Sequence, residues 1–185
     1  IHVAGTSFGG EVGLLLAARH GERVASLVAV TVVDYPPPGM QAIGERLVEL
    51  CQEAMATGDG RPFLDAMNEI VYSPPFRARV AADLAARAAA LASLPAAWFA
   101  GGVRLLQAVD RMDLRSELGR IACPTLVITA ERDELMPAER SLAVAETAAG
   151  AEHVVVAGSG HALVVEAKQR FLELVTEFLS RQSNR

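Results

Sequence analysis

The first ten residues, IHVAGTSFGG, constrain the fold of this chain more than any other stretch. Ile1–Ala4 has the composition of a buried strand, Gly5-Thr6-Ser7-Phe8-Gly9 fits the pattern G-x-S-x-G, and a helical pattern starts at once. A sharp turn from strand to helix holds its serine in a strained backbone conformation, so we expect any side chain larger than hydrogen at position 5 or 9 to crowd it. In a parallel sheet this turn lies at the carboxyl edge, where ligands bind. The stretch therefore predicts a reactive Ser7.

The composition indicates one soluble globular domain with a sizeable core. The chain has 185 residues, 51% of them hydrophobic, and a formal charge of −5. The acidic balance and the lack of a basic cluster argue against nucleic acid as a partner. Cys51 and Cys123 stand far apart outside any metal-binding spacing, which is typical of reduced thiols in a cytoplasmic protein and predicts no metal site. Because no apolar run is long enough to span a bilayer, we expect no membrane partner.

Strand and helix patterns alternate at both ends of the chain. Besides the first strand, residues 23–33, 125–130 and 152–157 form apolar or β-branched runs, and residues 9–19, 137–149 and 164–181 have helical periodicity. This alternation predicts an α/β fold, a parallel sheet flanked by helices. In the first helix Val12, Leu15, Leu16 and Arg19 recur at helical spacing, and the alanines beside them allow close packing on the sheet.

The middle of the chain has a different character. Residues 40–112 contain no convincing strand, and their apolar positions predict about four helices. So long a segment greatly exceeds an ordinary crossover between strands, although a helical crossover packed on the sheet is an alternative. We therefore divide the chain into a core part at 1–39, an insertion at 40–112 and a second core part at 113–185.

Three motifs carry a resemblance to a known family. GTSFGG at the start, PTLVITAERDELMP after residue 123 and AEHVVVAGSGHALVVE after residue 150 resemble the α/β-hydrolase superfamily. The resemblance covers residues 1–34 and about 121–182, and implies the α/β-hydrolase fold with a nucleophile elbow at Ser7 and a helical cap at 40–112. It also implies that further strands precede the elbow, so we expect this chain to be the C-terminal part of a longer protein that lacks its N-terminal half here.

Ser7 and His161 are the candidate nucleophile and general base. A serine hydroxyl needs a base to take its proton during attack on a carbonyl carbon. His161 follows the turn Gly158-Ser159-Gly160 at the end of a predicted strand, so its side chain should reach the same sheet edge as Ser7.

The base in turn needs a carboxylate that fixes its tautomer. Asp133 lies in the loop after the preceding strand, and the order serine, aspartate, histidine is that of the family which the chain resembles. Glu131 and Glu134 are alternatives on the same loop. Asp34 is a second competitor, because some members of that superfamily carry the acid after the strand that follows the elbow.

The resemblance also implies an oxyanion hole and a substrate pocket. The backbone N–H of Phe8 would supply one oxyanion donor, and the other would come from a loop that precedes this chain. Phe8 and Trp98 are the predicted substrate-binding residues. Other aromatic and apolar side chains of the middle segment would line an acyl pocket with Trp98: Phe63, Met67, Tyr72 and Phe99.

The resulting hypothesis is a serine hydrolase that cleaves a small-molecule ester or lactone through an acyl-enzyme intermediate, without a cofactor or a metal. Two alternatives stay open: an acyltransferase on the same scaffold, and a non-catalytic member of the fold that binds a small ligand. Because the first strand would pair with a strand outside the chain, we expect the 185 residues alone to be poorly soluble or to form a homodimer through that edge.

Overall fold

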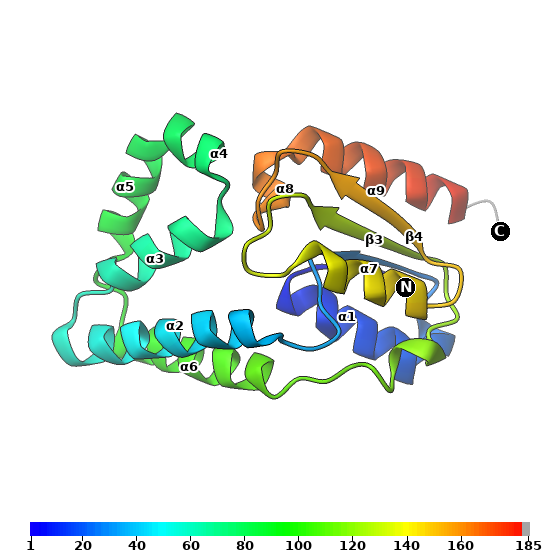
Figure 1. Ribbon diagram of the computed structural model, residues 1–185, viewed down its shortest axis with the longest axis horizontal. Coiled ribbons are helices and arrows are strands. Elements are labelled where there is room, and N and C mark those ends of the chain that lie inside the picture. The colour runs from blue at the N-terminus through cyan, green and yellow to red at the C-terminus, as the bar shows by residue number, and fades with distance from the viewer. Residues whose placement is uncertain (183–185) are drawn as a thin grey trace. The chain divides into compact units, whose positions relative to one another are not determined.

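The computed structural model describes residues 1–182, which form two compact units (Figure 1). The core unit consists of Ile1–Tyr35 and of residues 113–182, and the helical unit is Pro36–Met112. In chain order, the elements of the core unit are β1 (His2–Thr6), α1 (Phe8–Arg19), the 3₁₀ turn η1 (Gly21–Arg23), β2 (Ser26–Val30), the 3₁₀ turn η2 (Leu118–Arg120), β3 (Thr125–Ala130), α7 (Ala138–Thr147), β4 (Glu152–Val156), α8 (Leu163–Glu166) and α9 (Lys168–Gln182).

The four strands of the core unit form one parallel sheet in the order β1-β2-β3-β4. The register pairs Thr6 with Val30, Val30 with Ile128, and Ile128 with Val154, so the carboxyl ends of all four strands meet at one edge. β2 and β3 are buried along their whole length, as expected of central strands covered on both faces, whereas β1 and β4, the two edge strands, are more exposed. The predicted α/β fold with a parallel sheet flanked by helices is confirmed.

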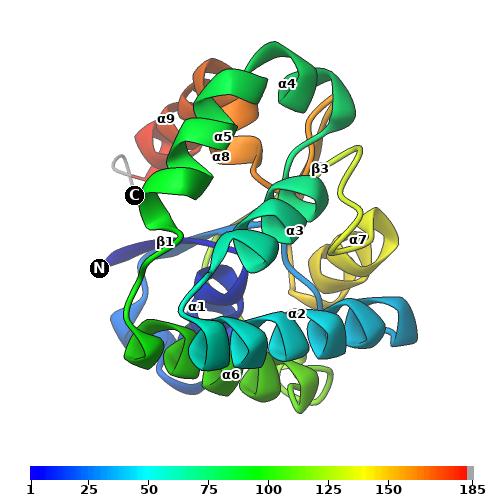
Figure 2. The same cartoon turned by 90° about the vertical axis from the view of Figure 1, so that its left-hand side faces the viewer.

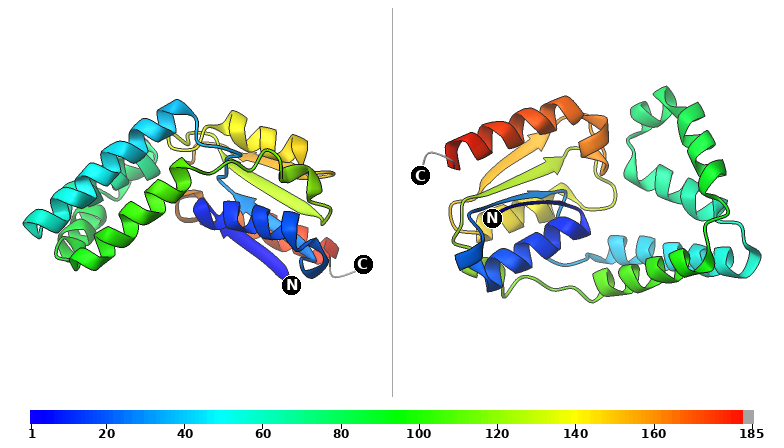
Figure 3. Two further views of the ribbon diagram at one scale, coloured as in Figure 1. Left: turned by 90° about the horizontal axis from the view of Figure 1, so that it is seen from below. Right: turned by 180° about the vertical axis from the view of Figure 1, so that it is seen from behind.

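Helices cover both faces of the sheet (Figure 1; Figure 3). α1 and α7 lie on one face, where α1 contacts β1 and β2 and α7 contacts β3 and β4. On the other face, α8 and α9 pack against the sheet through Leu163, Leu174 and Phe178. The side chains of the sheet in this buried apolar cluster are Val28, Val30, Leu126, Ile128, Ala130 and Val156. The sheet edge that carries the loops is therefore held from both sides.

The buried face of α1 differs from the one that its large apolar residues predict. Val12 is 52% exposed, and the residues that face the sheet are mostly small. They are Gly10, Gly13 and Ala17, together with Leu14 and Glu11. A Cβ atom on Gly13 would lie 3.0 Å from the Leu27 side chain of β2, so the close approach of helix and sheet leaves little room for a side chain at this position. The signal in the sequence was the spacing of small residues.

The second predicted strand, residues 23–33, is also shorter in the structure. β2 spans Ser26–Val30, and residues 21–23 form the 3₁₀ turn. The strand stops because Thr31 adopts a left-handed conformation, with φ of 49°, which turns the chain away from the sheet. Residues 164–181, predicted as one helix, are divided between α8 and α9, whereas the strand predicted at 125–130 is observed unchanged.

The helical unit contains five helices in place of the predicted four or so (Figure 2). They are α2 (Pro38–Thr57), α3 (Arg61–Val71), α4 (Pro74–Arg79), α5 (Ala81–Leu91) and α6 (Ala96–Asp110). The additional helix is α4, the shortest of the five, which begins with two prolines. Both lie in its first turn, where the missing N–H groups cost little, and Ser73 Oγ accepts a hydrogen bond from the Phe76 N–H at 3.4 Å.

The core of the helical unit lies where α2 and α6 run antiparallel, side by side. It contains Leu47, Leu50, Cys51, Ala54, Phe63 and Phe99. Within residues 1–182 no single helix is long and apolar enough to cross a membrane; α5 and α6, bent by 112° at their junction, meet that criterion only as a pair.

Candidate active site

Ser7 lies at the turn between β1 and α1 in a strained backbone conformation. Its φ of 53° and ψ of −133° are rare for a residue with a side chain. Hydrogen bonds hold the turn: the Ser7 N–H donates to the Val30 carbonyl at 2.9 Å, and the Gly10 N–H donates to the Ser7 carbonyl at 2.7 Å. The surrounding structure therefore maintains a conformation that an isolated peptide would leave.

Two glycines make this turn possible, and one of them is not the one expected. A Cβ atom on Gly5 would lie 2.2 Å from the Gly9 carbonyl oxygen, as the G-x-S-x-G pattern predicts. A Cβ atom on Gly9 would meet nothing within 4 Å, so the expectation for position 9 is wrong. The second tight position is Gly10, where a Cβ atom would lie 2.5 Å from Val32 Cγ1. The helix thus starts directly against the backbone of β1 and the segment after β2.

The structure brings Ser7, His161 and Asp133 together in one hydrogen-bonded line. His161 Nε2 lies 3.0 Å from Ser7 Oγ, and His161 Nδ1 lies 2.9 Å from Asp133 Oδ2. The Asp133 and His161 side chains are 1% and 9% exposed. An ionised Asp133 only accepts hydrogen bonds, so Nδ1 carries the imidazole proton and Nε2 can accept the hydroxyl proton of Ser7.

The two loops that carry the acid and the histidine are held by further hydrogen bonds. Asp133 Oδ1 accepts the backbone N–H groups of Leu135 at 3.0 Å and Met136 at 2.7 Å, so the carboxylate has little rotational freedom. Glu131 Oε2 accepts the Gly158 N–H at 2.8 Å and joins the loop after β3 to the loop after β4. Glu131 thus has a structural role in place of the catalytic one considered for it.

Asp34 lies in the same row of loops but has different partners. Its Oδ1 accepts the Tyr35 N–H at 3.2 Å and lies 3.6 Å from Arg140 Nε. Its carbonyl accepts the Leu114 N–H at 2.7 Å. Asp133, not Asp34, is therefore the carboxylate that contacts the imidazole, and Glu134 is exposed on the acid loop.

Phe8 and Trp98, the predicted substrate-binding residues, belong to different units. Phe8 opens α1, where the first N–H groups have no partner within the helix and attract negative charge. Trp98 lies in the helical unit, is 45% exposed and packs edge to face against Phe63 and Phe99. Phe99 is only 1% exposed and belongs to the core of that unit, contrary to its predicted place in a pocket wall.

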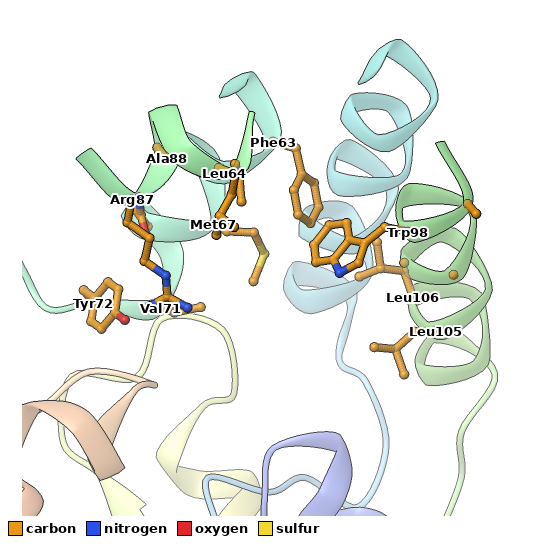
Figure 4. Close-up of a pocket in the computed structure, with 15 residues that line it drawn as sticks. Phe63, Leu64, Met67, Val71, Tyr72, Arg87, Ala88, Trp98, Leu105 and Leu106 are labelled. Carbon is orange, nitrogen blue, oxygen red and sulfur yellow. The ribbon is translucent and has the colours of Figure 1, made fainter. Parts of the chain in front are cut away.

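Trp98 lines a pocket of about 680 Å³ within the helical unit (Figure 4). Most of the lining side chains are apolar, and the predicted residues Phe63, Met67 and Tyr72 are among them. Figure 4 shows the Arg87 side chain extending from α5 toward Val71 and Tyr72. A volume and composition of this kind suit a small molecule with a hydrocarbon part.

Glu11 is a residue near the site that sequence reasoning missed. It lies in the first turns of α1, is 2% exposed, and accepts the Val33 N–H at 3.2 Å through Oε1. Burial raises the pKa of Glu11 to about 7; the hydrogen bond from Val33 opposes that rise, and the negative charge of Asp133 adds to it. A glutamate among the small residues of a buried helix face was the available signal.

The described part of the chain contains no group of three or more histidine, cysteine or acidic side chains able to hold a metal ion. Cys51 and Cys123 are both free and buried, and burial raises the pKa of the Cys51 thiol to about 11.

Comparison with known proteins agrees with the fold described above. The family described as the alpha/beta hydrolase fold matches residues 1–168. RutD of Stutzerimonas stutzeri (strain A1501), a protein whose name assigns it a carbamate hydrolase activity, is 29% identical over 98% of this chain and 66% of its own length.

Two solved structures are also similar. The MGS-M2 alpha/beta hydrolase from a deep-sea metagenome library of the Medee basin matches with a TM-score of 0.87 and 27% identity, over 96% of this chain and 64% of that one. The enol-lactonase from Burkholderia xenovorans LB400 matches with a TM-score of 0.79 and 25% identity over the same shares. The chain thus spans about two thirds of the length of these relatives.

Proposed function

This chain belongs to the α/β-hydrolase family, and we propose that it acts there as a serine hydrolase that cleaves a small-molecule ester or lactone through an acyl-enzyme intermediate. The observation that carries the proposal is the hydrogen-bonded line from Ser7 Oγ through His161 to Asp133, with distances of 3.0 and 2.9 Å. It comprises a nucleophile, a base in contact with it and an acid that orients the base.

In the first step, Ser7 Oγ attacks the carbonyl carbon while its proton passes to His161 Nε2. Asp133 stabilises the imidazolium that forms, and its own orientation is fixed by two backbone N–H groups. The carbonyl oxygen becomes an oxyanion, and the Phe8 N–H at the start of α1 is the donor that this chain supplies to it.

Collapse of the tetrahedral intermediate breaks the bond to the leaving alcohol. His161 Nε2 returns the proton to the departing oxygen, which leaves the acyl group on Ser7. Water then loses a proton to Nε2, attacks the acyl carbon, and releases the carboxylic acid with a regenerated Ser7 hydroxyl. In a lactone the alcohol and the acid stay in one molecule.

The apolar pocket of the helical unit supports a substrate with a hydrocarbon part, for which we propose Trp98 as a contact. The enol-lactonase and RutD, by their names, act on a lactone and a carbamate, both of which carry an acyl carbon that a serine can attack. A suitable panel therefore contains an ester, a lactone and a carbamate of matched chain length.

Labelling by a fluorophosphonate probe tests the proposal, because the probe requires an activated serine. We expect stoichiometric labelling of the protein and of the control variant Ser116→Ala, an exposed serine outside the site. Ser7→Ala should not be labelled and should lose hydrolysis of the panel. Labelling that persists in Ser7→Ala, or hydrolysis above a few per cent, would refute the covalent route.

The double variant gives a second test. Because Ser7 and His161 act as a unit in this mechanism, His161→Ala alone should remove most activity, and Ser7→Ala/His161→Ala should lose little more. Effects that multiply would mean that the two residues contribute independently.

A further inference from the structure

Glu11 places a carboxyl group inside the core unit, between α1 and the segment that follows β2. One oxygen, Oε1, accepts the Val33 N–H at 3.2 Å. The other, Oε2, is buried without a hydrogen-bond partner among residues 1–182. Its position in α1 also connects it to the Ser7 turn, because the Glu11 N–H donates to the Ser7 carbonyl at 3.2 Å. Backbone and side chain of one residue thus join the Ser7 turn to the segment after β2.

This environment favours the neutral form of the carboxyl group. A buried carboxylate with one unpartnered oxygen loses far more hydration energy than a buried carboxylic acid does. Asp133, which contacts His161, adds a negative charge nearby and further opposes ionisation of Glu11.

His20, Glu22 and Arg23 lie at or beyond the carboxyl end of α1, away from Glu11. Several other charged or titratable side chains on and around the elements that pack against α1 have partners of their own. These pairs are Arg19 with Glu117, Arg120 with Glu117, Asp34 with Arg140, and His2 with Ser26. Arg19 and Glu117 meet at the far end of the helix from Ser7. Within the described residues, these contacts offer Glu11 no cation as a partner.

We propose that Glu11 is a positioning residue for the Ser7 turn: a buried carboxylic acid that joins α1 to the segment after β2, and whose ionisation, which burial opposes, favours separation of these two segments. Ionisation would also place a second buried negative charge beside Asp133. Such a charge repels the Asp133 carboxylate, and displacement of the group that orients His161 lowers the activity of the Ser7–His161 pair.

The direction of the pH dependence follows from the position of the ionisation. The pKa of Glu11 is about 7 in the folded protein, above its ordinary value of 4.5. The stabilisation from this group is complete below pH 4.5, declines as the pH rises to 7, and is lost above it. Glu11 alone should therefore raise the unfolding equilibrium constant about 300-fold across that window.

Equilibrium unfolding of the whole protein between pH 4 and 8.5 tests the predicted effect of Glu11 ionisation on stability. Glu11→Gln keeps an acceptor for the Val33 N–H but cannot ionise. Its stability should therefore match that of the parent at pH 4.5 and exceed it increasingly up to pH 7. At pH 7 the unfolding equilibrium constant of the variant should be roughly 10²-fold or more below that of the parent. Glu22→Gln, which changes an exposed glutamate, should follow the parent at every pH. Parallel curves for the parent and Glu11→Gln would overturn the inference.

A direct measurement guards against a variant that folds poorly. In the ¹³C NMR spectrum of the unsubstituted protein, one glutamate carboxyl signal should titrate near pH 7, and it should be absent from Glu11→Gln wherever that variant folds. If every glutamate titrates below about pH 5.5, near the ordinary range, the carboxyl is not held neutral and the inference is wrong.

The catalytic half rests on the proposed function and has its own readout. The ratio of kcat/KM for Glu11→Gln over the parent should stay within twofold at pH 6 and rise at least threefold by pH 8, because only the parent ionises. A ratio that does not change with pH would mean that ionisation of Glu11 affects only the stability of the fold, and would overturn the catalytic part of the inference. If Ser7→Ala retained activity, the proposed function would fail while the unfolding and NMR tests of Glu11 stayed informative.

Discussion

Gly5→Ala is the perturbation that most directly tests why the Ser7 turn has its shape. The new Cβ atom would lie 2.2 Å from the Gly9 carbonyl oxygen and 2.7 Å from the Gly10 nitrogen. Both are backbone atoms at the start of α1, so no change of rotamer can relieve the overlap. Overpacking of this kind costs about 1–3 kcal/mol where side chains can adjust, and we expect about 3 kcal/mol or more here.

For a chain of this length, that loss corresponds to a fall in Tm of roughly 6–12 °C. Differential scanning calorimetry measures it, and labelling by a fluorophosphonate probe reports whether Ser7 is still presented. Gly9→Ala is the matched control, because its Cβ atom meets nothing within 4 Å and its φ is not positive. Alanine also favours helix over glycine by roughly 0.5–1 kcal/mol, so Gly9→Ala should melt at the parent temperature or slightly above it.

The prediction is tested by comparing the Tm of Gly5→Ala with that of Gly9→Ala. If Gly5→Ala melts within 2 °C of the parent and is labelled normally, close approach of β1 to α1 does not determine the turn. The same conclusion follows if Gly9→Ala is the more damaging change.

Two further predictions concern the acid and the pocket. Asp133→Asn should lower kcat by roughly 10⁴-fold with an unchanged Tm, whereas Asp34→Asn should lower kcat less than tenfold. Steady-state kinetics that reverse this order would assign the acid to the loop after β2. Trp98→Ala should lower kcat/KM about tenfold for a long-chain p-nitrophenyl ester and leave the acetate ester within twofold, because lost apolar contact penalises only the longer chain; an equal loss on both esters would exclude Trp98 from substrate contact.

The position of the site could be predicted because the carboxyl ends of parallel strands share one edge. Ser7, Asp133 and His161 each follow a strand that is visible as an apolar run, and the motif order matches the family. The loops after β1, β3 and β4 therefore all leave the sheet at this edge, although β2 separates β1 from β3. The structure brings the three side chains together at hydrogen-bonding distance.

Features that depend on contacts between distant segments could not be predicted. The left-handed conformation of Thr31 ends β2 early, although the β-branched sequence continues to Val33. Beyond Thr31 the chain bonds to distant helices, because the Val32 carbonyl accepts from Ser141 Oγ and the Val33 N–H donates to Glu11 Oε1. Likewise, the tight position is Gly10 because Val32 lies against it, and nothing in a G-x-S-x-G pattern specifies that neighbour. Glu11 is buried for the same reason, because the segment after β2 packs against the start of α1.

The hydrogen bond from the Leu114 N–H to the Asp34 carbonyl, at 2.7 Å, has a consequence for how this protein can vary. It joins the residues on either side of Pro36–Met112, and the Arg115 guanidinium lies 4.5 Å from the Tyr35 ring centre beside it. Residues 36–112 thus form an inserted segment whose first and last residues are held close together by the core unit. Such an inserted segment can be shortened, lengthened or exchanged at little entropic cost while Ser7, Asp133 and His161 keep their places.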